Sequence, residues 1–142
     1  MTLKQKNSIF AVLILVVVLF YVFSGGSVGV TLDFGEDALT VSASNYDWTV
    51  PYDQIAALEL TELPDRGTCL QGTEKRRLCC GTWDNGIWGE YTLCVDPRIE
   101  PCIVVTLDNG SIYVLNYENP DSTEQLHQMF TALLHSKGYL GN

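Results

Sequence analysis

The sequence predicts an α+β fold: an antiparallel, barrel-like β domain of about seven strands, capped by one C-terminal amphipathic helix and preceded by one N-terminal transmembrane helix. Three observations lead to this prediction. Apolar and polar residues alternate with a period of two over much of the chain after residue 27, turn sequences separate these stretches, and one helical stripe of apolar residues comes last. Such a helix must bury its apolar face, and the sheet is the element that can cover it.

An apolar segment opens the chain. Residues 9–23 carry no polar group except the Tyr21 hydroxyl, and residues 8–27 hold no charge, which is long enough for a helix to cross a hydrocarbon core of roughly 30 Å. Two interpretations compete: a retained signal-anchor, or a signal peptide cleaved at the small residues Ser24 to Ser27. We favour the anchor, because cleavage after Gly26 would leave almost no spacer before the first strand.

The charges on either side of this segment indicate its orientation. Lys4 and Lys6 precede the apolar run, whereas the first charge after it is Asp33. The positively charged flank of a membrane segment stays in the cytoplasm. The sequence therefore predicts a single-pass protein of the cell membrane, with a short cytoplasmic tail (1–7), a membrane segment (8–27) and an extracytoplasmic domain (28–142).

Four strands are predicted in the first part of the domain. Residues 28–34 and 39–43 alternate around the turn at 35–37, which is the pattern of a hairpin. A short strand at 48–50 ends at Pro51, and a strand at 55–60 is closed by the turn at 64–67. Residues 65–77 are the least regular stretch, and we expect a loop there.

Two more hairpins follow. Residues 78–83 and 87–95 flank Asp84-Asn85-Gly86, and residues 102–107 and 112–115 flank the turn at 108–111. An Asn-Gly pair between alternating stretches is a strong short-range hairpin signal. A hairpin centred on the two turn residues Asn85-Gly86 would place Cys79 opposite Thr92. Pro97 and Pro101 bracket the connection between the two hairpins.

A helix at about 122–137 closes the chain. Asp121 or Ser122 is expected to cap it, with Glu or Gln three positions later completing a capping box. His135 lies in the last turn, where the helix dipole favours cations, and Gly138 supplies the stop. The core-facing stripe consists of Leu126, Met129, Phe130, Leu133 and Leu134.

The charge balance limits the possible partners. After residue 23 the chain holds 6 Lys and Arg against 17 Asp and Glu, a formal charge of −11, and the whole chain carries −9. A body this acidic is a poor counterpart for DNA, RNA or an anionic lipid sheet. We therefore expect no nucleic-acid partner.

The sequence also resembles a known family. The residues that carry the resemblance are 50–55, 58–60, 63–64, 66–67, 81–83, 89–95, 103–110, 113–116 and Pro120. Together they resemble the bacterial pleckstrin-homology-like (PH-like) domain proteins with N-terminal membrane segments. The resemblance implies a PH-type barrel acting as a non-catalytic module with a largely undefined ligand. It does not imply phosphoinositide binding, which belongs to eukaryotic relatives with basic pockets. The cysteines and residues 69–77 depart from the family pattern.

The sequence gives little support for catalysis, a cofactor or a metal. His127 and His135 stand eight residues apart on the predicted helix without evident partners, so solvated or boundary histidines are expected. Motifs for a serine nucleophile, a phosphate loop or a zinc protease are missing. An enzyme of unknown class, such as a hydrolase with two carboxylates, is kept as a third alternative.

The cysteines are odd in number and lack paired C-x-x-C spacing, so structural zinc is not expected. A symmetric connection centred on Arg98 would place Cys94 opposite Cys102, and we predict a cross-strand disulfide between them. The alternative is that both are small buried thiols. A bridge from the 79–80 pair to Cys69 is a further option. The five cysteines are Cys69, Cys79, Cys80, Cys94 and Cys102.

Two surface features are candidate contact sites. The only basic cluster is Lys75-Arg76-Arg77, with Arg66 near it in sequence; it could contact an anion or an acidic partner, or be a solvated loop tip. Trp83 and Trp88 flank a predicted turn, where they could form an exposed aromatic pair or fold back over the barrel end.

These observations predict a non-catalytic module held beside the membrane by its N-terminal helix through a very short spacer. A protein partner is expected rather than a lipid. The alternative is a secreted or surface structural protein, released by signal cleavage.

Overall fold

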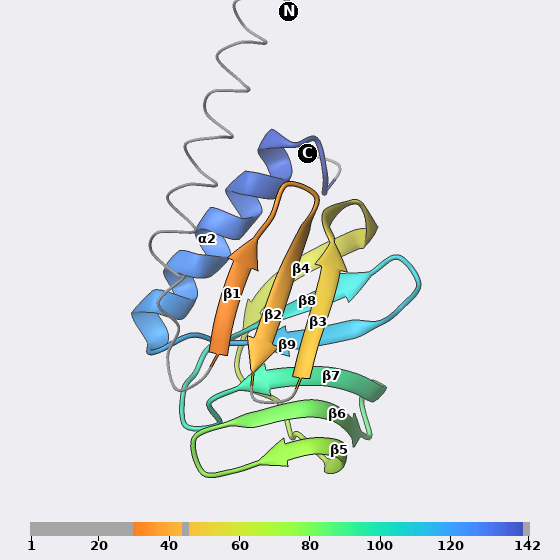
Figure 1. Ribbon diagram of the computed structural model, residues 1–142, viewed down its shortest axis with the longest axis vertical. Helices are drawn as coiled ribbons and strands as arrows, with labels where there is room; N and C mark the ends of the chain where they lie inside the picture. The colour runs from red at the N-terminus through yellow and green to blue at the C-terminus, as the bar shows by residue number, and fades with distance from the viewer. Residues whose placement is uncertain (1–29, 44–45, 141–142) are drawn as a thin grey trace, which may run out of the picture.

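The computed structural model describes residues 30–43 and 46–140 of the chain. These residues form nine strands, one 3-10 turn and one long α-helix, arranged as two sheets with the helix beside them (Figure 1). The predicted α+β class is confirmed. The predicted barrel is wrong, because neither sheet closes on itself.

The predicted membrane segment, residues 8–27, lies outside the described residues. Within the ranges that the structure describes, no helix has both the length and the apolar character needed to span a membrane.

The smaller sheet is an antiparallel meander of three strands, in the order β1-β2-β3. Its inner face buries alternate residues, including Leu32, Leu39 and Val41, as the period-two pattern predicts. The first hairpin is therefore confirmed, and the third strand extends beyond the predicted 48–50. The bounds are β1 Val30–Phe34, β2 Ala38–Ala43 and β3 Tyr46–Pro51.

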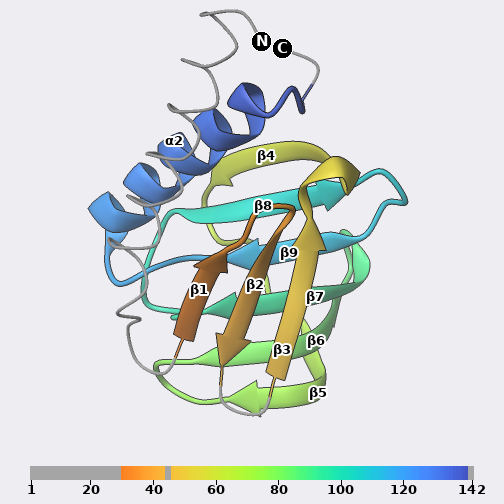
Figure 2. The same cartoon turned by 45° about the horizontal axis from the view of Figure 1, so that its top comes forward.

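The larger sheet has six strands in the order β4-β8-β9-β7-β6-β5. Every neighbouring pair is antiparallel except β7 and β9, which run parallel, so the prediction of a purely antiparallel domain is wrong at this pair. Figure 2 shows the smaller sheet lying across one face of the larger one. The bounds are β4 Ile55–Thr61, β5 Thr68–Glu74, β6 Cys79–Asn85, β7 Gly89–Val95, β8 Cys102–Leu107 and β9 Ile112–Leu115.

Strand β5 occupies a stretch that the sequence predicts to be a loop. The pairing with β6 shifts register between Cys69 and Gln71, which breaks the alternation, and most of this edge strand is exposed. Farther along, Gly72 faces Gly81. Glycine has no side chain, so these two positions do not show in the sequence which face of the strand is buried. The sequence signal is therefore lost although the strand forms.

The β6–β7 hairpin exists, but its register differs from the prediction. The loop is Gly86 to Trp88, so that Asn85 faces Gly89, and Cys79 faces Val95 instead of Thr92. The buried Asn85 carboxamide accepts hydrogen bonds from the backbone N–H groups of Ile87 (3.1 Å) and Trp88 (2.8 Å). This capping by Asn85 favours the three-residue loop over the two-residue one.

The helix α2 (Pro120–Ser136) is confirmed, but its predicted cap is wrong by two or more residues. Asn119 is the N-cap: its side chain accepts from the Ser122 N–H at 2.8 Å, and Pro120 follows as the first helical residue. The predicted stripe faces inward, with Met129 only partly buried.

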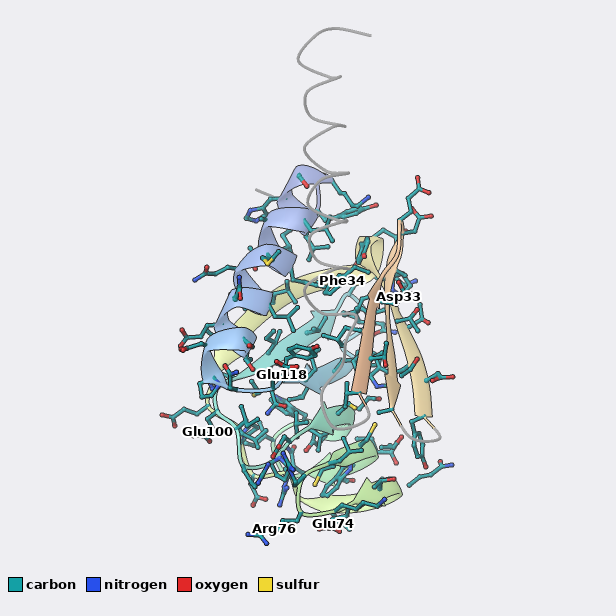
Figure 3. The ribbon with its side chains drawn as sticks, turned by 60° about the vertical axis from the view of Figure 1, so that its left-hand side comes forward. Asp33, Phe34, Glu74, Arg76, Glu100 and Glu118 are labelled. Carbon is teal, nitrogen blue, oxygen red and sulfur yellow. The ribbon has the colours of Figure 1, made fainter. Side chains whose placement is uncertain are left out.

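The main core lies between the two sheets, and α2 closes one side of it. Phe130 of α2 contacts Phe34 of β1 edge-on at 5.3 Å between ring centroids. Figure 3 shows Phe34 pointing from β1 toward the helix. A second apolar cluster, including Trp83, Leu93 and Val104, lies on the outer face of the larger sheet, where Leu63 of the β4–β5 connection packs against it.

Candidate functional site

The inner face of the larger sheet changes from buried to open along its strands. One row of facing residues, Cys80, Cys94 and Leu115, is fully or nearly fully buried beneath the smaller sheet. The next row toward the β6–β7 turn, Thr82, Thr92 and Tyr113, is half-buried. Beyond it Asp84 and Glu90 face one another and are exposed. The cover therefore ends at the middle row.

Trp48 of β3 marks the edge of this cover. Its ring stacks on Tyr113 of β9, with 4.8 Å between centroids and 28° between planes. The stacked pair separates the main core from the open part of the sheet.

A groove of about 190 Å³ lies where this open face meets the start of β9. In the described part of the chain β9 pairs only with Thr92 to Cys94 of β7, although β7 begins three residues earlier at Gly89. Strand β9 begins only at Ile112, so the first residues of β7 have no neighbouring strand on this side, which leaves a gap in the sheet. We call this gap the β7–β9 groove; it is lined by Thr82, Glu90, Tyr91, Thr92, Ser111, Ile112 and Tyr113.

Tyr91 lines the β7–β9 groove from the outer face of the larger sheet, where its side chain belongs to the second apolar cluster. Its hydroxyl donates to the Arg66 carbonyl oxygen at 2.8 Å, and Trp88 packs edge-on against its ring at 5.1 Å. Burial raises the pKa of Tyr91 to about 12, so the phenol is neutral at physiological pH. The Tyr91 side chain therefore contributes a neutral, hydrogen-bonded ring on the outer face of the larger sheet.

The predicted aromatic pair does not form an exposed surface. Trp83 is 1% exposed within the outer cluster, and Trp88 is half-buried against Tyr91, so the folded-back interpretation is correct. The exposed apolar residue at this turn is Ile87, between the two tryptophans, with 70% of its surface exposed. It stands at the β6–β7 turn, near the end of β7 where the groove opens.

The four predicted basic residues split into two environments. Lys75, Arg76 and Arg77 are exposed in the β5–β6 turn, and Figure 3 shows Arg76 pointing outward from it. Arg66 instead lies against the outer face of the larger sheet: its guanidinium is 5.7 Å from the Trp83 ring centroid and donates to the Cys79 sulfur at 3.1 Å. Arg66 therefore contributes to packing and does not extend the exposed cluster.

The basic turn lies at the opposite end of the sheet from the β7–β9 groove. Arg77 and Asp96 line a small depression together with Val30, the first described residue of β1. Arg98 donates to Asp96 at 2.9 Å and, with Arg77 nearby, lowers the pKa of that carboxyl. The basic turn thus has an acidic neighbour that offsets part of its charge.

The structure does not bring Cys94 and Cys102 together, so the predicted pairing is wrong. Strand β9 lies between their strands: Cys94 of β7 faces Leu115, and Cys102 of β8 faces Thr61. The Asn116 carboxamide stabilises the 96–101 connection: it accepts from the Asp96 N–H at 2.9 Å and donates to the Ile99 carbonyl oxygen at 3.0 Å. The chain therefore turns away from β7 before β8 begins.

All five cysteines are thiols in this structure, and they divide between the two faces of the larger sheet. Cys80 and Cys94 belong to the core between the sheets. Cys69, Cys79 and Cys102 belong to the outer cluster.

Neither histidine lies in a group of side chains that could bind a metal ion. His135 is exposed on α2 and His127 is half-buried, with an Nε2 atom that has no hydrogen-bond partner among the described residues. Over residues 30–43 and 46–140, no three His, Cys, Asp or Glu side chains converge as a metal site.

Comparisons with protein-family models, curated proteins and solved structures found no match to this chain. The function of the groove is therefore inferred from its own residues. Sequence patterns missed it because it arises from a pairing between strands that are not consecutive in the chain. The nearest local signal was the predicted Asp84-Asn85-Gly86 turn, which the exposed Ile87 follows.

Proposed function

We propose that this chain is a non-catalytic binding module of the bacterial PH-like type, tethered to the cell membrane with its domain outside the cytoplasm. Its β7–β9 groove would hold an extended segment of a protein partner. The observation that carries this proposal is that Gly89, Glu90 and Tyr91 of β7 have no partner in β9 among the described residues. Backbone groups of these residues that point away from β6 border the groove, and an added strand could pair with them.

The size and lining of the groove favour a polypeptide over a small molecule. Small-molecule sites usually enclose roughly 300–1,000 Å³, whereas this groove offers about 190 Å³ and is open to solvent. Hydroxyl groups of Thr82, Thr92 and Ser111 can both donate to and accept from a peptide backbone. Ile87 at its mouth provides an apolar contact for a side chain of the partner.

Charge suggests the composition of the partner segment. Asp84 and Glu90 are exposed on the face that leads into the groove, and the whole chain carries −9. A positively charged partner associates faster with this acidic surface, and acidic polypeptides are repelled from it. A partner segment with a positive charge next to an apolar residue fits this surface best.

The membrane tether fits this arrangement. The described chain begins at Val30, beside Arg77 and Asp96, at the end of the larger sheet opposite Ile87. A tether entering there leaves the groove accessible to a neighbouring protein. N-terminal sequencing of the mature protein tests the tether: an anchor keeps the first residues, and a new N-terminus near residue 27 would favour the secreted alternative.

The experiment that tests the groove is a peptide selection. The full chain in phospholipid nanodiscs is used to select from a random heptapeptide library, beside Glu90→Lys and the control Glu36→Lys, which makes the same charge change in the exposed β1–β2 turn. We expect basic peptides with one apolar residue for the wild type and for Glu36→Lys, and their loss for Glu90→Lys. Peptides that bind all three proteins equally would contradict the proposal.

A further inference from the structure

Two buried cysteines face each other across the β6–β7 hairpin. Cys80 of β6 pairs in register with Cys94 of β7, and both side chains are fully buried on the inner face. Each thiol is the largest influence on the pKa of the other, as expected for side chains in close contact. Facing residues on antiparallel strands have Cα atoms about 4.5–5.5 Å apart, within the range of about 4.4–6.8 Å that a disulfide spans.

We propose that Cys80 and Cys94 form a redox pair that closes into a cross-strand disulfide in the exported protein. In the cell this inference rests on the extracytoplasmic location proposed above, because exported proteins meet oxidants that cytosolic proteins do not. The chemical part of the inference depends only on the hairpin.

The other three cysteines do not compete for this pairing in the folded chain. Cys69, Cys79 and Cys102 lie on the outer face of the larger sheet, so the sheet itself separates them from Cys80 and Cys94. The Cys79 sulfur accepts from Arg66, and the Cys102 thiol donates to the Glu62 carbonyl oxygen at 3.8 Å. One disulfide on the inner face and three thiols on the outer face account for the odd number of cysteines.

The closure needs a disulfide-class oxidant, such as oxidised glutathione or a thiol oxidase. The Cys80 thiol loses its proton, and its sulfur attacks the oxidant, forming a mixed disulfide and releasing one oxidant sulfur as a thiol. The Cys94 thiol then loses its proton and attacks the Cys80 sulfur, which forms the Cys80–Cys94 bond and releases the second oxidant thiol. The two cysteines together lose two protons and two electrons, and the oxidant disulfide gains them.

The two facing side chains also influence each other's ionisation. The neighbouring Cys94 thiol lowers the pKa of Cys80, whereas Cys80 together with burial raises the pKa of Cys94. Both side chains are closed off from solvent in the folded chain. The oxidant must therefore reach them while the inner face of the hairpin is uncovered, so closure accompanies folding.

The test is refolding of the full chain from denaturant in detergent micelles containing a glutathione redox buffer. We expect alkylation under denaturing conditions to label three thiols, two fewer than the five of the reduced chain. Cleavage after glutamates separates Glu90 from Tyr91, so the bridge must link the fragment containing Cys79 and Cys80 to the fragment containing Cys94. Tandem mass spectrometry that breaks the peptide bond between Cys79 and Cys80 shows which of these two cysteines is bonded to Cys94, and it needs no substitution.

The substitution Cys80→Ala should abolish this link, whereas Cys69→Ala, the matched control on the outer face, should retain it. Five free thiols after equilibration, or a bridge from Cys94 to Cys69, Cys79 or Cys102, would overturn the inference. Alkylation in intact cells then tests the location separately. If the disulfide forms in the redox buffer but the two cysteines are reduced in cells, the pairing of Cys80 with Cys94 is supported and the extracytoplasmic location is contradicted.

Discussion

Arg66 shows that a residue grouped with a basic cluster by sequence can have a packing role. Its guanidinium covers the Trp83 ring and donates to Cys79, while its carbonyl oxygen accepts from Tyr91. The side chain thus joins the β4–β5 connection to β6, and the backbone carbonyl joins it to β7.

We predict that Arg66→Ala lowers the free energy of unfolding by about 1–2 kcal/mol, because a cation–π contact and a hydrogen bond are lost. Arg76→Ala, in the exposed turn, should leave the urea midpoint unchanged. Urea unfolding of the full chain in micelles measures both. Equal effects of the two substitutions would contradict the packing role of Arg66.

Tyr91 makes stability depend on alkaline pH. Burial raises its pKa from 10.0 to about 12, so the folded chain keeps a proton that the unfolded chain loses. The resulting stability is fully present below pH 10 and is lost as the pH rises to 12. We expect a loss on the order of 2 kcal/mol over this interval.

The substitution Tyr91→Phe is the control for that titration. It should flatten the fall in stability between pH 10 and pH 12, leaving the part due to Tyr52, whose pKa burial also raises. Unfolding followed by circular dichroism at stepwise pH gives both curves. Superimposable curves would show that Tyr91 is not the titrating group.

At the scale of elements, β5 depends on two facing glycines. A Cβ on Gly81, at φ +128°, would lie 2.1 Å from the Gln71 carbonyl oxygen, and a Cβ on Gly72 would meet the Cys80 carbonyl oxygen equally closely. Side chains at these positions would push β5 away from β6. The two glycines interrupt the alternating pattern that predicts a strand. Their lack of side chains nevertheless lets β5 pair closely with β6.

We therefore predict that Gly81→Ala destabilises the chain by roughly 2 kcal/mol or more, because φ and the close backbone both oppose a Cβ. Gly86→Ala is the matched control, since a Cβ there meets no atom within 4 Å. Thermal unfolding compares the two. If Gly81→Ala were as stable as Gly86→Ala, the β5–β6 pairing described here would be wrong.

The start of α2 offers a second comparison between elements as predicted and as observed. Asn119→Ala should lower stability by about 1 kcal/mol, because it removes the acceptor for the Ser122 N–H. Asp121→Ala, at the position expected from sequence to cap the helix, should have a smaller effect. If urea unfolding showed a larger loss of stability for Asp121→Ala than for Asn119→Ala, the N-cap would be Asp121, as expected from the sequence.

Local patterns predicted the elements that are defined by neighbours in sequence. The alternation in β1 and β2, the turn before β9 and the stripe of α2 all depend on residues close together in the chain, and all are present. Pairing between distant strands carries no local signal, so the parallel β7–β9 pair and the groove that it opens were missed. The Cys94–Cys102 prediction failed for the same reason, because β9, which follows both cysteines in the chain, lies between their strands.

At the scale of the whole molecule, two open sheets replace the predicted barrel. The smaller sheet and α2 cover part of the inner face of the larger sheet, and the rows beyond Cys80 and Cys94 remain open (Figures 1 and 2). A closed barrel would have removed this surface. The proposed binding site depends on this incomplete cover.

Site-specific cross-linking tests the central proposal most directly. A photoreactive phenylalanine derivative replaces either Ile87, at the mouth of the β7–β9 groove, or Leu70, which is 49% exposed on the edge strand β5 and serves as the control. The full chain is then irradiated in its own membranes. We predict one discrete adduct from position 87, abolished by Glu90→Lys, and none of that mass from position 70. Identical adducts from both positions, or none from position 87, would contradict a partner in the groove.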